Sequence, residues 1–340
     1  MSATFKSRLA AIINSFIGQF RDLLDKSIID PIGGFINKLQ GMGPQVPITR
    51  LDNVHLNEIE EYWTDHTVLA PSFRSSYLSR RYIAKRFKMH PLFKKISGLY
   101  GTHDGETVLD YGCGPGNDVT GFTLYTNPKK IIGMDISYTS LEHTAKRLSL
   151  HKIDPKRVAL IQISDSDSHI PLPDNSVDFI NCQGVLMHTS QPAVLISEFY
   201  RILKPGSCAT IMVYVKASIW YHLYTAYETM IILGKFASYD VATAFSKNTD
   251  GENCPMSRCY DPDTFKSLCE SEGFRCTFEG GYFTHTELNS ISKYYEKALS
   301  DSRLNDNHKQ FLQSLKFDKN GFPTYNNHYA GLSGIFLCKK

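Results

Sequence analysis

The chain has 340 residues, and its 37 Lys and Arg nearly balance its 34 Asp and Glu, for a formal net charge of +3. This balance argues against a general polyanion binder, such as a DNA-binding protein, although a local basic patch is compatible with it. Hydrophobic residues make up 42% and charged residues 21%, a globular composition. No apolar run approaches the roughly 20 residues of a membrane-spanning helix. We therefore expect a cytoplasmic protein with a substantial core.

The eight cysteines have no regular spacing, and no secretory leader precedes them. They predict no disulfide framework. There is no Cys-x-x-Cys pair, so we expect no structural zinc and no other bound metal.

The first hundred residues carry 14 Lys and Arg against 8 Asp and Glu, and are more basic than the rest. Apolar residues recur at helical spacing over Phe5–Leu24 and predict an amphipathic helix. Three roles remain open for it: contact with a membrane surface, a mitochondrial presequence, or packing on its own domain or a partner subunit, as in a homodimer. Residues 1–100 are expected to form a helical N-terminal region.

The segment Arg74–Lys95 has eight basic residues, no acidic residue and several interleaved aromatic residues. Basic and aromatic groups together hold phosphates and stack rings, so an anionic or aromatic substrate is one interpretation. The alternative is a helix with a solvated basic face and an aromatic core face.

From Thr107 onwards short apolar runs alternate with helical segments, which is typical of a parallel α/β sheet. We predict strands at Thr107–Tyr111, Lys130–Met134, Val158–Ile163, Val177–Asn181, Cys208–Val215, Phe274–Phe283 and Leu332–Lys339. We predict helices near Val119–Leu124, Ser140–Leu150, Pro192–Leu203 and Asp261–Glu272. The segments near 216–260 and 284–330 are long enough to be caps over a domain that spans 101–340.

A glycine-rich turn, Asp110-Tyr-Gly112-Cys-Gly114-Pro-Gly116, follows the first of these strands. Glycine permits a sharp bend and a close approach to a ligand, and the helix start beyond it offers free N–H groups. A dinucleotide site would have its third glycine one residue later, and the Asp110 carboxylate would repel a pyrophosphate. The turn therefore favours a ligand that carries an ammonium group.

These residues resemble motif I of the class I S-adenosylmethionine (SAM)-dependent methyltransferases, of the type 11-like, small-molecule branch. Four further segments resemble that family in order: Ile131–Ser137, Pro171–Asp178, Val185–Thr189 and Glu198–Gly206. The resemblance implies a Rossmann-like seven-stranded sheet, mostly parallel with an antiparallel last strand, with helices on both faces. It also implies SAM as methyl donor and S-adenosylhomocysteine as product.

The resemblance implies roles for individual residues of the cofactor site. Asp110 and the turn at Gly112, Gly114 and Gly116 would hold the methionine portion. Asp135, with Ile136 beside it, would accept the ribose hydroxyls.

The residues expected at the adenine and sulfonium ends of the cofactor follow the family pattern less closely. The family's acidic residue lies five positions before Pro171, whereas Asp165 lies six and Asp167 four positions before it. Asp165, with Ser166 beside it, is the favoured adenine residue. Gln183 would approach the sulfonium.

The acceptor is expected to be a small organic or lipid-linked molecule, methylated on oxygen or nitrogen rather than carbon. There is no Asn-Pro-Pro-aromatic motif after the fourth strand and no RNA-binding module. His188 and Tyr214 are the preferred catalytic residues, since methyl transfer sometimes needs a base. The other candidate bases are Tyr221, His222, Tyr224, His285, His328 and Tyr329.

Two loop-like segments are further candidates for the acceptor side of the pocket. The loop at Phe322–Gly331 and the turn-rich segment Thr249–Tyr260 would lie over the pocket. Arg258 would bind an acidic group of the acceptor or form a structural ion pair. An RNA or protein methyltransferase that uses the basic 74–95 face, and a non-catalytic SAM-binding partner protein, are the alternative functions.

Overall fold

The computed structural model describes residues 31, 35, 41–50, 57–67 and 71–340. The helix expected over Phe5–Leu24 lies outside the described residues. Within them, no helix combines the length and the apolar character that a membrane crossing requires.

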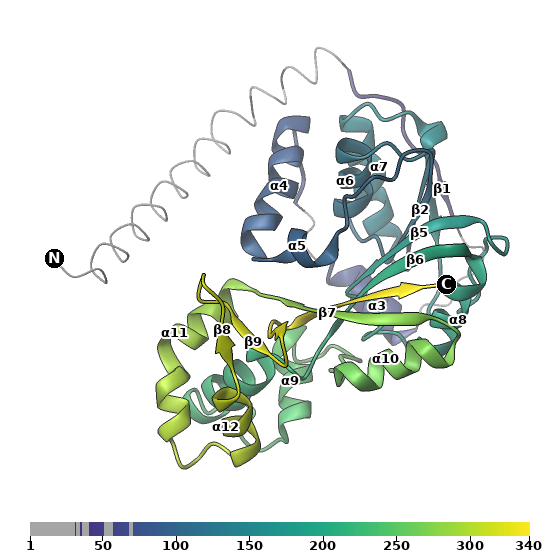
Figure 1. Cartoon of the computed structure of the whole chain (residues 1–340). Helices are drawn as coiled ribbons and strands as arrows, with labels where there is room; N and C mark the ends of the chain where they lie inside the picture. Colours follow the sequence, from purple (N-terminus) through teal and green to yellow (C-terminus); the bar gives the residue numbers. More distant parts are fainter. Residues whose placement is uncertain (1–30, 32–34, 36–40, 51–56, 68–70) are drawn as a thin grey trace.

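An eight-stranded sheet lies at the centre of the described chain, in the order β1-β4-β3-β2-β5-β6-β11-β7 (Figure 1). Its strands are β1 (Ile48–Thr49), β2 (Thr107–Tyr111), β3 (Lys130–Asp135), β4 (Val158–Gln162), β5 (Val177–Gln183), β6 (Leu203–Tyr214), β7 (Arg275–Tyr282) and β11 (Ser333–Lys339). Neighbouring strands are parallel from β1 to β6, whereas β11 is antiparallel to both β6 and β7.

The Rossmann-like fold with an antiparallel last strand is confirmed, but the predicted number of seven strands is wrong. The eighth strand, β1, pairs through Ile48 and Thr49 with Leu160 and Ile161 of β4. A two-residue strand is too short to show an alternating hydrophobic pattern, so the sequence gives no sign of it. Through β1, part of the N-terminal hundred residues joins the central sheet.

Helices cover both faces of this sheet (Figure 1). On one face, α6 and α7 pack against β3 and α4 packs against α7; on the other, α8 contacts β6 and α10 contacts β7. The helices up to residue 202 are α3 (Glu58–Asp65), α4 (Ser76–Met89), α5 (Phe93–Ser97), α6 (Asn117–Tyr125), α7 (Tyr138–Leu150) and α8 (Pro192–Ile202). Helix α10 (Pro262–Ser271) comes later in the chain, before β7. Their apolar faces form two buried clusters, one on each side of the sheet.

The strand predicted over Cys208–Val215 begins five residues earlier in the structure. Strand β6 begins at Leu203, which pairs with Val177 of β5, so the Lys204-Pro-Gly206 turn lies inside the strand and interrupts its register. Gly206 keeps the positive φ of 81° that a turn requires.

The two long segments between the sheet strands form a cap with its own buried core. The segment 216–260 contains a π-helix, η3 (Trp220–Ile232), and α9 (Val241–Thr249). The segment 284–330 contains α11 (His285–Ser300), α12 (Asp306–Gln313) and a small antiparallel sheet of β8 (Lys316–Phe317), β9 (Pro323–Tyr325) and β10 (His328–Tyr329). These elements lie together at one end of the main sheet (Figure 1).

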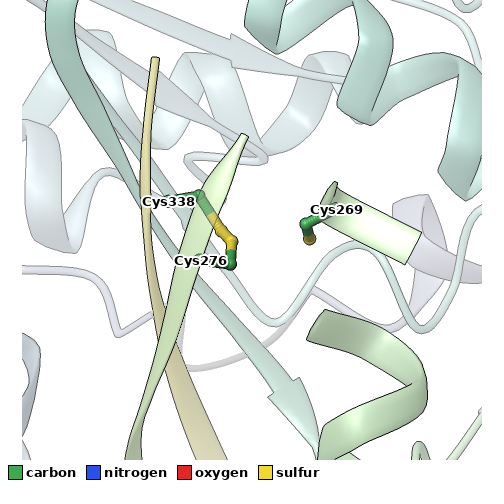
Figure 2. A group of neighbouring side chains, drawn as sticks. All are labelled: Cys269, Cys276 and Cys338. Atoms are coloured by element: carbon green, nitrogen blue, oxygen red, sulfur yellow. A yellow bond between two sulfur atoms is a disulfide. The ribbon is translucent and has the colours of Figure 1, made fainter. Parts of the chain in front are cut away.

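The expectation of no disulfide is wrong at one pair, Cys276 in β7 and Cys338 in β11. The antiparallel register places these two residues directly opposite each other, with 4.2 Å between their Cα atoms. Figure 2 shows this disulfide with the buried thiol of Cys269 of α10 opposite it. The pair is 62 residues apart in the chain, so spacing alone could not reveal it.

Candidate active site

A cavity of about 410 Å³ lies at the carboxyl ends of the parallel strands. Its lining includes residues at or just after the ends of β2, β3, β4, β5 and β6: Gly112, Asp135, Asp165, Gln183 and Tyr214. Carboxyl ends of parallel strands meet at one edge of a sheet, where α/β proteins bind ligands. Gly114, Ile136 and His188 line the cavity as well, so the structure brings eight of the eleven predicted site residues around one space. The other three, Asp110, Gly116 and Ser166, are absent from the lining.

The glycine turn after β2 depends on the absence of side chains. Gly112 has a φ of 71°, and a Cβ there would lie 2.1 Å from Cγ2 of Val185. Gly116 begins α6 with a φ of 75°, and its Cβ would lie 2.6 Å from Thr144. Gly114, in contrast, has no atom within 4 Å of a would-be Cβ. Gly112 and Gly114 line the cavity, while Gly116 supports the turn from behind.

Two buried polar groups near this turn have hydrogen-bonding atoms without a partner among the described residues. Asp110 is 2% exposed, and its Oδ1 accepts a hydrogen bond from Asn181 at 2.7 Å, but its Oδ2 accepts none. Burial, followed by the nearby Asp118 carboxylate, raises the pKa of Asp110. Both polar atoms of the Gln183 side chain are also unpaired. Because unpaired buried acceptors and donors are costly, these groups fit a ligand with an ammonium group and further polar atoms.

Asp135 ends β3 and holds the glycine turn in place. Its Oδ2 accepts from the backbone N–H of Gly114 at 2.7 Å and its Oδ1 from that of Ser137 at 2.8 Å. Burial raises the pKa of Asp135 to about 6, although both backbone N–H groups act in the opposite direction. The carboxylate keeps lone pairs for further donors, which suits it to a ribose diol. Ile136, the next residue, also lines the cavity.

The structure separates the residues considered for adenine. Asp165 lines the cavity, and its Oδ1 accepts from the Thr189 hydroxyl at 2.6 Å. Ser166 and Asp167 are exposed and are absent from the cavity lining. Ser166 donates or accepts a hydrogen bond with Ser164, and Asp167 accepts from the N–H of His169.

Helix α3, which the sequence analysis did not single out, anchors the N-terminal segment to the site. Glu60 is fully buried, and its Oε1 accepts from the N–H of Asp165 at 2.8 Å and from the Ser164 hydroxyl. One turn later, Trp63 lines the cavity with its ring 4.7 Å from the ring of His188. The helix therefore connects the loop after β4 to the opposite end of the cavity.

That opposite end contains His188, Tyr214 and Asp250, and Asp250 is the residue that sequence reasoning missed. Tyr214 donates to Asp250 Oδ1 at 2.8 Å, and the Ser257 hydroxyl donates to Asp250 Oδ2 at 2.6 Å. His188 Nδ1 lies 2.7 Å from the carbonyl oxygen of Met256, while its Nε2 lies 3.9 Å from Asp250 Oδ2. The turn-rich segment that was expected near the pocket therefore supplies its carboxylate.

These contacts define the protonation of the two preferred catalytic residues. Since the Met256 carbonyl only accepts, His188 carries its proton on Nδ1 and leaves Nε2 unprotonated when neutral. Burial lowers the pKa of His188, against the opposing effect of Asp250. Burial and the same carboxylate raise the pKa of Tyr214 well above its usual value. Neutral His188 therefore offers Nε2 as a hydrogen-bond acceptor, whereas Tyr214 is a donor to Asp250.

The other candidate bases lie away from this cavity. Its lining contains none of Tyr221, His222, Tyr224, His285, His328 and Tyr329. His222 pairs with His308 inside the cap, and the segment Phe322–Gly331 forms the small cap sheet rather than a loop over the pocket. Leu332 and Ser333, which follow that segment, do line the cavity.

Two arginines near the cavity, Arg86 and Arg258, contact other groups of the protein. Arg86 lines the cavity from α4 but forms an ion pair with Asp118, which also accepts a hydrogen bond from Tyr100. Arg258 donates to the carbonyl oxygen of Thr189 and so fixes the loop before α8. Among the described residues Arg258 forms no ion pair, and its guanidinium contacts a backbone carbonyl instead. A role in binding an acidic group of the acceptor stays a prediction.

Among the described residues, one group of side chains of the types that can ligate a metal lies at the cavity. Single donor atoms of His188, Asp250 and Cys254 lie within 4.8 Å of one another. Both oxygens of Asp250 already accept hydrogen bonds from Tyr214 and Ser257.

The comparisons with known proteins agree with this geometry. Residues 109–211 match the family model described as a methyltransferase domain. An uncharacterized methyltransferase of Schizosaccharomyces pombe is 32% identical over 104 residues, 30% of this chain and 37% of that protein. The ubiquinone/menaquinone biosynthesis C-methyltransferase of Escherichia fergusonii is 26% identical over 55% of this chain and 74% of its own length. A Haemonchus contortus phosphoethanolamine N-methyltransferase 2 in complex with SAM has a similar fold, with a TM-score of 0.50, 16% identity, and coverage of 84% of this chain and 60% of that one.

Fold, glycine turn and family match define residues 109–211 as a class I SAM-dependent methyltransferase domain. The cofactor of this domain is SAM, which the unpaired Asp110 oxygen, the open space at Gly114 and the Asp135 carboxylate fit. The chain spans only about a third of the length of the relatives that match it above 30% identity. The acceptor therefore has to be argued from the remaining residues.

Proposed function

We propose that the protein transfers a methyl group from SAM to an oxygen or nitrogen atom of a small organic molecule. One observation supports this most: a single cavity joins the residues suited to SAM, such as Asp135, to a second set around His188 and Asp250. A sulfonium supplies an activated methyl group, so the protein mainly has to align the acceptor and exclude water.

In this proposal Asp110 binds the methionine ammonium, Asp135 the ribose hydroxyls and Asp165 the adenine edge, with Ile136 and Gln183 beside them. Gly112 and Gly114 give the cofactor access to the backbone, and Gly116 starts the supporting helix. Ser166 has no role in this proposal, because it is exposed and absent from the cavity lining.

His188 is proposed as the proton acceptor. His188 lines the cavity, and a proton taken up on its Nε2 is stabilised by Asp250 Oδ2 at 3.9 Å. Tyr214 is a positioning residue in this scheme, because its hydroxyl orients the Asp250 carboxylate.

The test combines cofactor binding with turnover. S-adenosylhomocysteine should bind to the full chain, NADH should not, and methylated product should form from deuterium-labelled SAM with an acceptor from a panel of small alcohols, phenols and amines. EDTA should leave the rate unchanged, because in-line displacement from a sulfonium needs no metal. Failure of S-adenosylhomocysteine to bind would contradict the proposal.

A further inference from the structure

The end of the cavity beyond the SAM residues has a net negative charge. The charged side chains among its described lining residues are Arg86, Asp135, Asp165 and Asp250. Asp135 and Asp165 belong to the proposed cofactor end, and Arg86 is neutralised by its ion pair with Asp118. Asp250 is the carboxylate that remains, with only about 10% of its side chain exposed.

Aromatic residues line the same cavity as this carboxylate. The chain contains two tryptophans, and both of them, Trp63 and Trp220, line the cavity. Trp220 donates from its indole N–H to Thr249, the residue before Asp250, which fixes the ring beside the carboxylate. A carboxylate among aromatic faces is the environment that binds organic cations.

Asp250 and His188 also present two hydrogen-bond acceptors to one place. Oδ2 of Asp250 and Nε2 of His188 lie 3.9 Å apart, and neither can donate to the other when His188 is neutral. A nitrogen placed about 2.8 Å from both atoms would donate one N–H to each. A hydroxyl has a single proton and can donate to only one of these two atoms, of which Oδ2 of Asp250 also accepts from Ser257.

We propose that the acceptor is a primary or secondary amine, bound as its ammonium ion between Asp250 and His188. This inference rests on the proposed function, since it assigns the substrate class of the same site. The bound ammonium gives one proton to Nε2 of His188 and becomes a neutral amine. Its nitrogen lone pair then forms the N–C bond as the C–S bond breaks, and the bonding pair of that bond stays on sulfur.

The charge of Asp250 matches this reaction and opposes the alternative. In amine methylation positive charge moves from sulfur to nitrogen, so a carboxylate beside the nitrogen stabilises the transition state more than the neutral amine that precedes it. A hydroxyl or phenol has to approach an anion before it attacks, and a neighbouring carboxylate makes that ionisation less favourable. The site is therefore built for an acceptor that begins and ends as a cation.

The test is calorimetric binding to the full chain saturated with S-adenosylhomocysteine. The probes are phenethylamine, 2-phenylethanol and 3-phenylpropionate, together with a panel of small primary amines and their matched alcohols. We expect amines to bind at least tenfold more tightly than their alcohols and the carboxylate not to bind. Asp250→Asn should reduce this preference to less than threefold without changing the affinity for S-adenosylhomocysteine.

Asp301→Asn is the matched control, because Asp301 accepts a hydrogen bond from Tyr227 but does not line the cavity. It should keep the preference for amines. Alcohols that bind as tightly as amines, or no amine binding while S-adenosylhomocysteine still binds, would overturn the amine proposal alone. Loss of S-adenosylhomocysteine binding in the wild type would instead overturn the proposed function.

Discussion

The two ends of the cavity are built in different ways. At the cofactor end, Asp110, Gly112, Gly114 and Asp135 lie near strand ends, and the Asp135 side chain is held by backbone N–H groups of the same short turns. At the acceptor end, Trp63, His188, Tyr214, Trp220 and Asp250 come from five separate segments and are held by contacts between side chains and loops. The first kind of site is encoded locally, and the second exists only once the cap has packed on the sheet.

This comparison predicts that the acceptor end can be damaged without the cofactor end. Glu287 is fully buried in α11 and accepts from the N–H groups of Thr284 and Leu332, both of which line the cavity. Glu287→Ala should lower the free energy of unfolding by about 4–5 kcal/mol, because it leaves several buried donors unpaired. Urea unfolding would measure this loss.

Glu296→Ala on the exposed side of α11 is the control for that variant and should be nearly neutral. Any folded fraction of the Glu287 variant should still bind S-adenosylhomocysteine. A loss below about 1 kcal/mol would show that Glu287 does not support the loops of the acceptor end.

The converse change should affect the cofactor end first. Asp135→Ala removes the charged acceptor proposed for the ribose hydroxyls and releases Gly114. We expect the affinity for S-adenosylhomocysteine to fall about 1,000-fold, roughly 4 kcal/mol, from two lost charge-assisted hydrogen bonds. Calorimetry would measure it, with circular dichroism to show that the chain still folds. An unchanged dissociation constant would refute the ribose role.

A change at the proposed proton acceptor should leave the cofactor end intact. His188→Gln removes the unprotonated Nε2 and should reduce kcat about 100-fold, the usual contribution of a general base. The dissociation constant for S-adenosylhomocysteine should stay within threefold of the wild type. If kcat is unaltered, the proton is accepted elsewhere.

The smallest expected effect is on the pH dependence of stability and arises in the cap. The Nδ1 atoms of His222 and His308 lie 2.8 Å apart, and burial, followed by His308, lowers the pKa of His222 from 6.5 to about 3. The folded state therefore disfavours protonation, so stability is retained above pH 6.5 and lost as the pH falls towards 3. Between pH 7 and pH 4.5 this histidine should cost about 2 kcal/mol.

His222→Asn, which keeps a polar partner for His308, should reduce this acid sensitivity in urea unfolding. His169→Gln, at a mostly exposed histidine, should not. Equal acid sensitivity in the two variants would exclude the cap pair as its source.

The same difference between the two ends explains how much the sequence could predict. Strand β2 has the predicted bounds, and the ends of β3 and β4 differ by one residue, because apolar runs and turn residues are local signals. The family resemblance implies Asp135 and Asp165, and both of them line the cavity. The contact of Glu60 with Asp165 spans 105 residues, and no local pattern encodes it.

Asp250 shows the limit most clearly. It follows α9 in a polar, turn-rich segment, where an aspartate ordinarily serves as a turn residue. Only the contacts with Tyr214 and His188 reveal it as a cavity carboxylate. The disulfide between Cys276 and Cys338 depends in the same way on a register that spacing does not show.

The central claim is that one cavity has a cofactor end at Asp135 and an independent acceptor end at Asp250. Titration of S-adenosylhomocysteine into the wild type, Asp135→Asn and Asp250→Asn tests it most directly. The account predicts a large loss of affinity in the Asp135 variant and wild-type affinity in the Asp250 variant. Equal affinities in both variants, or a loss confined to Asp250→Asn, would contradict it.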